Sequence, residues 1–483
     1  MTVDFEASGR LRSSGLLTDL YELTMMQGYR HFGKDEPVVF DVFFRSQPFN
    51  GGYSVFAGLE DVLALLSNLS FNDGDVAWLS GLGIFRDEFL RDLESFKFQG
   101  DVYSMPEGSM VFPGEPIMRI HAPLSQAQLM ETVILNTVNF QSLVATKAAR
   151  IFNAGRHGSV LEMGMRRAQG PDGALSASRA SYIGGASGTS NTYAGKLFGI
   201  PVRGTMAHSW VMSFETEYEA FERYAQLYPD GCIFLVDTYD TLRSGIENAI
   251  AVGARLAEGG HNFGIRLDSG DLYYLSVKCR KRLDEAGFPE AKIAVSNELD
   301  ERVIHQLISD GAPIDLWGVG THMVTGGDQA SFPGVYKLSA RTVRGRLEPV
   351  MKVSDTPEKA SNPGIKQVYR FYDEGDEPLA DLICLEDHPP DPGEPIEFYH
   401  PSSDRQHFTM QNYGRFEPLL SKVMENGTIC KPLPSLPEIR EHAVAELRHL
   451  DTTYKRIINP HIYKVSLSSS LKQLKSEMQE RVR

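Results

Sequence analysis

The chain has few cysteines, no long apolar run and no excess of basic residues, and each shortage excludes a class of protein. The cysteines are scattered without metal-ligand spacing, so we expect buried thiols in a reducing cytosol at Cys232, Cys279, Cys384 and Cys430. No stretch of about twenty apolar residues, the length that spans a membrane, occurs in the sequence. The N-terminal residues lack the apolar core of a signal peptide. We therefore expect a cytoplasmic protein without a membrane partner.

The charge balance argues against nucleic acid as a partner. The formal net charge is −15 over 483 residues, whereas binding to nucleic acid needs a basic face. Local basic pockets for small phosphates are compatible with this total. With 42% apolar and 23% charged residues, the composition is that of an ordinary enzyme. The length predicts two or three domains.

The most informative segment is GIRLDSGDLYYL, which begins at residue 264. Phe263–Leu267 is typical of a buried strand, and Leu272–Ala286 has the apolar spacing of an amphipathic helix. The N-terminus of such a helix attracts phosphate or pyrophosphate. Asp271 alone is better explained as a helix cap, but capping does not explain a charged arginine at the end of a strand. The connection gathers Arg266, Asp268, Ser269, Gly270 and Asp271.

The same signature recurs at roughly thirty-residue intervals, which is the spacing of a βα repeat. Each further strand is followed by polar residues or glycines; these strands are Ser159–Glu162, Cys232–Val236, Lys292–Val295 and Ile314–Trp317. Helices are expected from the residues after Asp240 through Ala257 and over Glu301–Ser309. The pattern predicts a (β/α) barrel over residues 150–335 with its active site at the carboxyl ends of the strands. A doubly wound open sheet would show similar local patterns and is the alternative.

The rest of the chain predicts a second domain assembled from both sides of the barrel. Strands are expected over residues 37–45 and 100–120, with helices over Leu59–Leu69 and Leu124–Phe152. Strand-like stretches return after residue 335, and the tail from Leu436 is charged and mostly helical. The proline-rich stretch from Asp387 to Asp404 is expected to be a surface loop. The expected division is 1–149 for the N-terminal open α/β domain, 150–335 for the barrel, and 336–483 for the completing segments and helical tail.

Seven motifs in order along the chain resemble those of the nicotinate phosphoribosyltransferase family. The resemblance runs from about residue 16 to at least residue 370. The motifs are LLTDLYELTMMQGY, FDVFFRSQPFNGGYSVFAGLEDVL, LEMGMRRAQGPDGA, GGASGTSNTYAGKLFGIPVRGTMAHSW, FLVDTYDT, IRLDSGDL and DLWGVGT.

This resemblance implies a reaction, a fold and an assembly. The family joins nicotinate to phosphoribosyl pyrophosphate, gives nicotinate mononucleotide and pyrophosphate for NAD salvage, and couples this to ATP hydrolysis as a ligase-type enzyme. Its fold is the irregular (β/α) barrel of type II phosphoribosyltransferases plus an open α/β (α+β) domain built from N- and C-terminal segments. It acts as a head-to-tail homodimer with shared active sites. Magnesium is implied through pyrophosphate and ATP rather than through a protein cage.

The resemblance assigns a pocket for nicotinate. Arg266 would pair with the carboxylate, a task suited to a planar bidentate donor, although an internal ion pair with Asp268 or Asp237 is the alternative. Ser190 would contact the same carboxylate, at a place where nicotinamide-using relatives have an aspartate. Asp19 and Tyr21 resemble residues donated by the second subunit, with Tyr21 stacking on the pyridine ring. On the opposite face the family often has a phenylalanine, whereas this chain has Met163, which can still make a sulfur–aromatic contact.

The resemblance also assigns groups to the sugar and its phosphates. Arg166 and the backbone of Gly318, Gly320 and Thr321 would hold the 5′-phosphate, because glycines let the backbone approach an anion closely. Asp237 and Asp268 would lie by the ribose hydroxyls and stabilise positive charge developing at the anomeric carbon. Arg45 resembles the arginine that grips pyrophosphate, assisted by three lysines that are otherwise ordinary surface charges: Lys352, Lys359 and Lys366.

His208, in TMAHSW, matches the histidine that this family phosphorylates with ATP. A neutral imidazole is a competent nucleophile near physiological pH. Without the resemblance, a histidine at a strand-to-helix junction is better explained as a capping or core residue. Two other functions stay open at this point: the same reaction on nicotinamide, which Ser190 disfavours, and a non-catalytic nucleotide-binding regulator on the same fold, which would have no need of a nucleophile.

Overall fold

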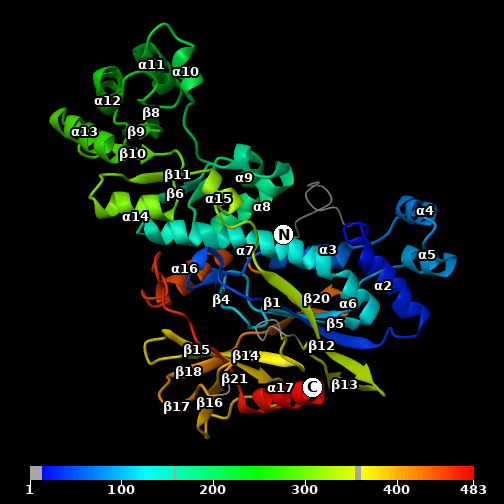
Figure 1. Cartoon of the computed structure of the whole chain (residues 1–483). Coiled ribbons are helices and arrows are strands. Elements are labelled where there is room, and N and C mark those ends of the chain that lie inside the picture. The colour runs from blue at the N-terminus through cyan, green and yellow to red at the C-terminus, as the bar shows by residue number, and fades with distance from the viewer. Residues whose placement is uncertain (1–13, 157–158, 354–359, 404, 483) are drawn as a thin grey trace. The chain divides into compact units, whose positions relative to one another are not determined.

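The protein is described by a computed structural model over residues 14–156, 159–353, 360–403 and 405–482 (Figure 1). The chain divides into two compact units, unit 1 (Met1–Leu143 with Ser331–Arg483) and unit 2 (Val144–Ala330). The boundaries expected from the sequence, 149/150 and 335/336, lie a few residues further along the chain. Unit 2 is thus inserted between the two segments of unit 1.

Unit 2 is built around a six-stranded parallel sheet with strand order β7-β6-β11-β10-β9-β8. Its strands are β6 (Ser159–Glu162), β7 (Gly188–Thr189), β8 (Cys232–Leu235), β9 (Phe263–Leu267), β10 (Lys292–Val295) and β11 (Leu316–Val319). β9 lacks the alternation of buried and exposed residues seen in half-exposed strands. Four of its five residues are buried, as in sheets covered on both faces. Among the described residues β7 and β8 form the edges of this sheet, which is a curled half-barrel. The expected fold class, an irregular (β/α) barrel with a separate α/β domain, is confirmed by this curled parallel sheet.

Helices follow the strands of unit 2 and cover the sheet. They are α8 (Gly170–Ile183), α9 (Thr192–Phe198), α10 (His208–Met212), α11 (Glu217–Leu227), α12 (Ile246–Glu258), α13 (Leu272–Glu285), α14 (Glu301–Ser309) and α15 (Thr321–Thr325), with short turns η2 (Met165–Arg167) and η3 (Thr241–Gly245). α12 buries residues at three- and four-residue spacing. Gly253 is needed on this helix because a Cβ there would lie 2.4 Å from the Phe263 ring of β9. Close packing of α12 on β9 therefore depends on that glycine.

Aspartates begin three of these helices. The side chain of Asp240 accepts from the N–H groups of Leu242 and Arg243, and Asp300 does the same at α14. Asp271 accepts from the N–H of Tyr274 at 3.0 Å, which confirms its expected capping role. These caps fix where each helix starts, and so fix the loops at the carboxyl ends of the strands.

β11 begins two residues later than the sequence predicted. The expected strand was Ile314–Trp317, whereas pairing with β6 and β10 starts at Leu316. Asp315 precedes the strand because its carboxylate accepts from the N–H of Ile293 at 2.9 Å. Gly318 therefore lies inside β11, opposite Leu161, and not beyond its end.

The first sheet of unit 1 has seven antiparallel strands in the order β13-β12-β1-β5-β3-β19-β20. These are β13 (Arg346–Pro349), β12 (Gly334–Val343), β1 (Pro37–Phe44), β5 (Met118–Pro123), β3 (Asp101–Ser104), β19 (Ser421–Glu425) and β20 (Thr428–Ile429), and a separate pair joins β2 (Ser54–Val55) to β4 (Met110–Val111). A large apolar core joins this sheet to its helices. The helices are α2 (Leu20–His31), α3 (Leu59–Asn68), α4 (Asp73–Gly81), α5 (Asp87–Glu94), α6 (Leu124–Leu129) and the start of α7 (Glu131–Ala154), with the turn η1 (Pro48–Asn50) after β1.

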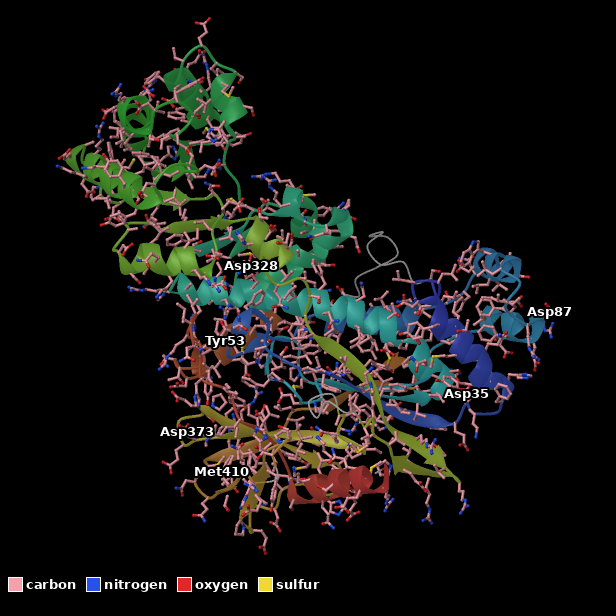
Figure 2. The ribbon with its side chains drawn as sticks, in the orientation of Figure 1. Asp35, Tyr53, Asp87, Asp328, Asp373 and Met410 are labelled. Carbon is pink, nitrogen blue, oxygen red and sulfur yellow. The ribbon has the colours of Figure 1, made fainter. Side chains whose placement is uncertain are left out.

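The second sheet of unit 1 comes from the C-terminal segment, in the order β17-β16-β21-β15-β14-β18. Its strands are β14 (Lys366–Tyr372), β15 (Pro378–Leu385), β16 (Ile396–Tyr399), β17 (His407–Met410), β18 (Arg415–Pro418) and β21 (Val465–Leu467), and two helices, α16 (Leu436–His449) and α17 (Ser469–Val482), accompany them. α17 packs on this sheet through Leu471, which meets Ile383 and Leu467. Asp373, labelled in Figure 2, shapes the β14–β15 turn by accepting from the N–H groups of Gly375 and Glu377.

Two expectations about the C-terminal segment are corrected by the structure. The stretch 387–404 was expected to be a loop, but it contains β16, whose Ile396 and Phe398 alternate into the core of the second sheet. Cys430 was expected to be buried, but it is exposed just after the short edge strand β20; Cys232, Cys279 and Cys384 are buried and free as predicted. The expected helical tail is confirmed by α16 and α17, with β21 between them.

None of the described helices is both long and apolar enough to cross a membrane.

Candidate active site

The carboxyl ends of β8, β9 and β10 bring two carboxylates, two hydroxyls and a backbone N–H into one hydrogen-bonded group. Asp237 Oδ2, after β8, accepts from the backbone N–H of Asp268 at 2.8 Å and from Ser269 Oγ at 2.6 Å, both after β9. Ser296 Oγ, after β10, donates to Asp268 Oδ1. Asp237 Oδ1 is buried and has no hydrogen-bond partner in the described part of the chain. The carboxyl ends of these parallel strands thus form an acidic site in which Asp237 Oδ1 has no described partner.

His208 lies between the loops after β8 and β9. It is the first residue of α10, and its Nδ1 lies 3.1 Å from Thr238 Oγ1. Its Nε2 lies 3.7 Å from Asp268 Oδ2, which is beyond hydrogen-bond distance but within ion-pair distance for a protonated ring. About two fifths of the side chain, 39%, is open to solvent. The alternative of a core residue does not fit this exposure, and the ring has one described hydrogen-bond partner, the Thr238 hydroxyl.

Arg266, on β9, is largely buried and incompletely bonded. Its Nη1 donates to Thr205 Oγ1, and its buried Nε has no hydrogen-bond partner among the described residues. Burial lowers the pKa of the guanidinium, while the nearby carboxylates of Asp268 and Asp237 act in the opposite direction. No ion pair joins Arg266 to either aspartate within the described residues, so the alternative of an internal ion pair is not borne out. The side chain has donors left for an anionic ligand.

Met163 lies beside two glycines, Gly318 within β11 and Gly320 just after it. A Cβ on Gly318 would lie 2.8 Å from Met163 Sδ, and one on Gly320 would lie 3.3 Å from the carbonyl oxygen of Met163. Gly320 and Thr321 follow the strand, as expected, and lie at the start of α15, whereas Gly318 serves the packing of Met163 from within the sheet. Small residues on β11 thus make room for the methionine at the end of β6.

Glu162 braces this side of the site, and the sequence reasoning did not single it out. It is fully buried at the end of β6, where it accepts from the N–H of Gly164, from Ser178 Oγ at 2.9 Å and from Thr189 Oγ1. Its backbone carbonyl accepts from the N–H of Ser190 at 2.8 Å. Glu162 thereby fixes the loop that carries Met163 and the exposed Arg166, together with Ser190. A charged residue ending an apolar strand was the available signal.

Comparison with known proteins matches three successive stretches of the chain to one family. Residues 16–139 match the nicotinate phosphoribosyltransferase (NAPRTase) N-terminal domain, 159–376 the NAPRTase family, and 365–475 the nicotinate phosphoribosyltransferase C-terminal domain. Nicotinate phosphoribosyltransferase of Bacillus subtilis (strain 168) is 43% identical, with 94% of this chain and 93% of that protein covered. The Homo sapiens protein of the same name is 36% identical over 98% of each chain. The chain belongs to the nicotinate phosphoribosyltransferase family.

A solved structure supports the same assignment. The crystal structure of human nicotinic acid phosphoribosyltransferase superposes with a TM-score of 0.84 at 33% identity, covering 95% of this chain and 99% of that one. The structure of nicotinate-nucleotide pyrophosphorylase from Pyrococcus furiosus has a TM-score of 0.69 at 24% identity, which is evidence for the fold alone.

The remaining residues that the nicotinate phosphoribosyltransferase resemblance assigned lie in unit 1. Asp19 precedes α2 and accepts from Thr132 Oγ1 at 2.9 Å, and Tyr21 on α2 is 47% exposed, as a residue reaching another chain would be. Arg45 follows β1 and is exposed, as is Lys352. Lys359 lies outside the described residues. Their roles at a nicotinate phosphoribosyltransferase site stay predictions.

Lys366 differs from the surface lysine that was expected to assist in gripping pyrophosphate. It is 2% exposed at the start of β14, and its Nζ forms an ion pair with Asp41 Oδ2 of β1 at 2.7 Å and donates to the carbonyl of Gly364. Burial lowers the pKa of this amine, and Asp41 opposes that effect. The described contacts therefore give Lys366 a role in joining the two segments of unit 1.

No cluster of three or more His, Cys, Asp or Glu side chains that could hold a metal ion occurs in the described part of this family member. The acidic group after β8 and β9 has only two carboxylates, Asp237 and Asp268, which is fewer than such a cluster needs. The unpartnered Asp237 Oδ1 fits a cation that is otherwise held by substrate phosphates.

Proposed function

We propose that this chain transfers the phosphoribosyl group of phosphoribosyl pyrophosphate to nicotinate and couples that transfer to ATP hydrolysis, as part of NAD salvage in the cytoplasm. One observation carries the proposal. At the carboxyl edge of the unit 2 sheet, a buried arginine nitrogen and a buried carboxylate oxygen, Arg266 Nε and Asp237 Oδ1, both lack partners among the described residues. Buried polar atoms without partners are costly, and opposite charges in one site suit a ligand that carries both signs.

The geometry suits the transfer step. The carboxylate of nicotinate would take the free donors of Arg266, which orients the ring nitrogen toward the sugar. The nitrogen lone pair then forms the bond to the anomeric carbon, and the electron pair of the breaking C–O bond leaves with pyrophosphate. Positive charge on the sugar develops next to Asp237 and Asp268. Because Ser269, Ser296 and a backbone N–H already hold these carboxylates in place, they need little reorganisation during the reaction.

We assign the ATP-dependent step to Nε2 of His208. With the Nδ1 proton donated to Thr238, the lone pair is on Nε2, which has no hydrogen bond to Asp268. This nitrogen would attack the γ-phosphorus, and the bond to the bridging oxygen would break with its electron pair leaving on ADP. Water would later attack the phosphohistidine and release phosphate. Magnesium, held through substrate phosphates with Asp237 or Asp268 as protein ligand, would neutralise phosphate charge.

The same proposal includes a homodimer in which α2 of the second subunit completes each site. The exposed Tyr21 supports it, because a tyrosine ring left 47% open on a helix is available to another chain. Mixing a Tyr21→Ala subunit with an Asp268→Ala subunit, each inactive alone, should restore activity through hybrid sites. A fully active monomer by sedimentation would contradict the shared site.

The decisive experiment is a turnover assay with radiolabelled nicotinate, phosphoribosyl pyrophosphate and ATP, run in parallel with nicotinamide. We expect nicotinate mononucleotide, pyrophosphate, ADP and phosphate, with the acid preferred over the amide. Product from the amide at an equal kcat/KM would contradict the substrate assignment, and tight nucleotide binding without any product would favour a non-catalytic regulator. Product without ATP consumption would contradict only the coupling.

A further inference from the structure

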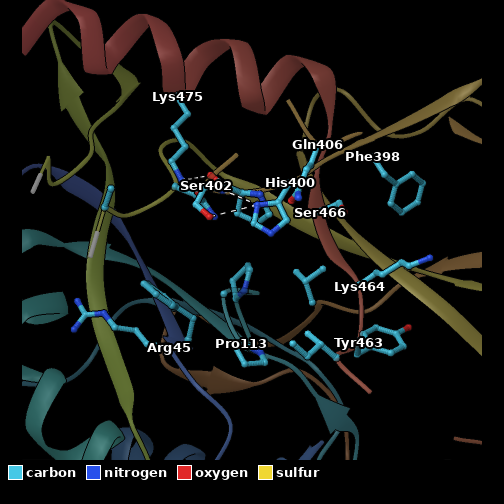
Figure 3. Close-up of a pocket in the computed structure, with 18 of the residues that line it drawn as sticks. Arg45, Pro113, Phe398, His400, Ser402, Gln406, Tyr463, Lys464, Ser466 and Lys475 are labelled. Atoms are coloured by element: carbon cyan, nitrogen blue, oxygen red, sulfur yellow. Dashed lines mark hydrogen bonds between the residues drawn. The ribbon is translucent and has the colours of Figure 1, made fainter. Parts of the chain in front are cut away.

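A large cavity lies within unit 1, and all of its described lining residues belong to that unit. Its volume is about 750 Å³, and it is bounded by the loop between β16 and β17, by β21, by α17 and by the end of β1 (Figure 3). Ligand sites in proteins typically have volumes of about 300 to 1,000 Å³. One part of the lining is apolar and aromatic, with Phe43, Pro113, Phe398, Phe408 and Tyr463. A flat organic group of nucleotide size would find contacts there.

The charged residues of this cavity are almost all basic. Asp41 is the one carboxylate among its described lining residues, and Lys366 already neutralises it. The other formal positive charges belong to Arg45, Arg405, Lys464 and Lys475. This concentration stands out because the whole chain has a net charge of −15. Like charges that share a cavity repel one another, so an anion there would relieve the repulsion.

Lys475 places a buried ammonium group in the wall of the cavity. It lies four residues after Leu471 on α17, so it shares the helix face that packs on the second sheet. It is only 7% exposed, and its Nζ donates to Asn362 Oδ1 at 2.9 Å and to the carbonyl of Pro401 at 3.3 Å. No carboxylate lies within ion-pair distance among the described residues. Burial, together with repulsion by Lys472 and Lys366, lowers the pKa of Lys475 to about 8.

His400 adds a neutral donor to the same wall. Its Nδ1 accepts from the backbone N–H groups of Ser402 at 3.2 Å and Ser403 at 3.1 Å, so Nδ1 carries the lone pair. In the neutral ring the proton is then on Nε2, which has no protein partner in the described part of the chain. Figure 3 shows Lys475 extending from its helix toward His400 and Ser402. An anion beside Lys475 would therefore find both a charged and a neutral N–H donor.

We propose that this cavity is a second ligand site, which binds a polyphosphate group through Lys475, His400 and Arg405. The apolar wall favours a nucleoside polyphosphate as the carrier of that group, and free polyphosphate is the other source of the same chemistry. The proposal does not depend on the proposed reaction, because the residues that carry it lie in the connection between β16 and β17 and on α17. Arg45 and Lys366, to which the family resemblance gives a pyrophosphate role, also line the cavity and are therefore left unchanged in the test.

The test is hydrogen-exchange mass spectrometry of the full-length protein, titrated with ADP, inorganic tripolyphosphate or adenosine. Peptides that cover 396–403, 405–410 and 465–482 report on the cavity, and peptides that cover 232–271 report on the sheet edge of unit 2. We expect ADP and tripolyphosphate to slow exchange in the cavity peptides, and adenosine to have no effect. Stronger protection by ADP would identify a nucleotide as the ligand, and equal protection would identify polyphosphate itself; both support the site.

Three variants decide whether Lys475 is responsible. A hydrogen bond to a charged group contributes about 1.5 to 3 kcal/mol, so Lys475→Met should raise the half-saturating concentration of ADP at least about tenfold. Arg405→Gln, at an exposed position, should raise it several-fold, and it keeps the test valid if Lys475→Met loosens α17 without ligand. Lys281→Met is the matched control, because it removes one exposed positive charge from unit 2. Protection by adenosine equal to that by ADP, no protection of the cavity peptides, or unchanged titration in both Lys475→Met and Arg405→Gln would overturn the proposal. Protection confined to 232–271 would overturn it while leaving the proposed function intact.

Discussion

Arg370 in unit 1 and Arg266 in unit 2, one buried and the other largely buried, are bonded in opposite ways. Arg370, in unit 1, is 1% exposed, and each of its guanidinium nitrogens has an acceptor: both oxygens of Asp381, Glu446 Oε2 and the carbonyl of Met110. Arg266, in unit 2, has one hydroxyl partner, from Thr205, and a buried Nε without an acceptor among the described residues. An arginine whose nitrogens all have acceptors within the protein stabilises the fold. An arginine with donors left at the end of a parallel strand is available to a substrate.

The largest effect is expected at the sheet edge, where His208→Ala should remove chemistry and leave the fold intact. ATP hydrolysis and its stimulation of product formation should fall by about a thousandfold or more, as when other catalytic nucleophiles are removed, while slow ATP-independent transfer persists. The measurement is ADP release against nucleotide formation. His305→Ala, on the exposed face of α14, is the matched control. Hydrolysis that still keeps step with product in His208→Ala would show that the histidine is not the phosphorylated residue.

Replacing Arg370, whose nitrogens all have acceptors, should destabilise the fold and not remove chemistry. Arg370→Met leaves Asp381 buried with Tyr463 as its remaining side-chain donor, and an unpaired buried charge costs about 3 to 5 kcal/mol. The free energy of unfolding in urea should fall by that amount. Arg266→Met, which gives up one hydrogen bond, should lose about 1 kcal/mol. Equal losses in the two variants would remove the distinction between the arginines.

The preference for nicotinate over nicotinamide should depend on Arg266, which has unused donors. Nicotinate places a carboxylate against Arg266, whereas nicotinamide leaves the guanidinium without a counter-charge, at a cost of about 3 to 5 kcal/mol. Since about 1.4 kcal/mol is a factor of ten, the preference in kcat/KM should be at least about a hundredfold. Arg266→Lys keeps the charge but loses the planar donor pair, so it should retain part of the preference, and Arg266→Ala should nearly abolish use of nicotinate. Ser190→Asp should lower the preference by repelling the acid. A parent protein that uses both substrates equally well would disprove this role for Arg266.

An effect confined to high pH is expected at an exception within unit 1, the buried Glu22. Gln128 donates to its Oε2 at 2.7 Å, but its Oε1 has no partner among the described residues. Burial raises the pKa of Glu22 from 4.5 to about 7. The folded state therefore holds a proton that the unfolded state releases, so this contribution to stability is complete below pH 4.5 and is lost as the pH rises through 7.

Glu22→Gln should remove this pH dependence. Relative to the parent, the variant should be equally stable at pH 4.5 and more stable by about 2 to 3 kcal/mol at pH 8. Urea unfolding at a series of pH values measures the difference, with Glu88→Gln, at an exposed position on α5, as the control. A difference that does not change with pH would contradict the raised pKa.

The sequence predicted best the parts of unit 2 that a local pattern marks. β6, β9, β10 and α14 lie where the spacing of apolar residues put them, and Asp271 caps α13 through the N–H of Tyr274, three residues later. β11 was misplaced because its start is set by pairing with β6, more than 150 residues earlier in the chain. Gly318 consequently changed from a loop position to a sheet position. Local patterns carry no information about that register.

The site was predictable where side chains follow strands, and not where partners are distant. Asp237, Asp268 and His208 were found from strand ends and the family resemblance, and the structure brings them together. Lys366 could not be placed from sequence, because its burial depends on Asp41 of β1, which is remote in the chain. Thr205 was missed for a related reason, because it acts by bonding to Arg266, about 60 residues later in the chain. Glu162 was missed although its position at the end of an apolar strand marked it.

The insertion of unit 2 into unit 1 has a consequence during synthesis on the ribosome. β1 pairs on one side with β5, which is made soon afterwards, but on its other side Phe40 pairs with Leu338, about 300 residues later. At about 5 to 20 residues per second, that open edge waits for roughly 15 to 60 seconds. Throughout that time an apolar strand, VVFDVFF, offers unpaired N–H and C=O groups to any neighbouring nascent chain. Unit 2, whose strands pair within one continuous segment, can fold during the delay. The edge of β1 is thus open to aggregation before synthesis is complete.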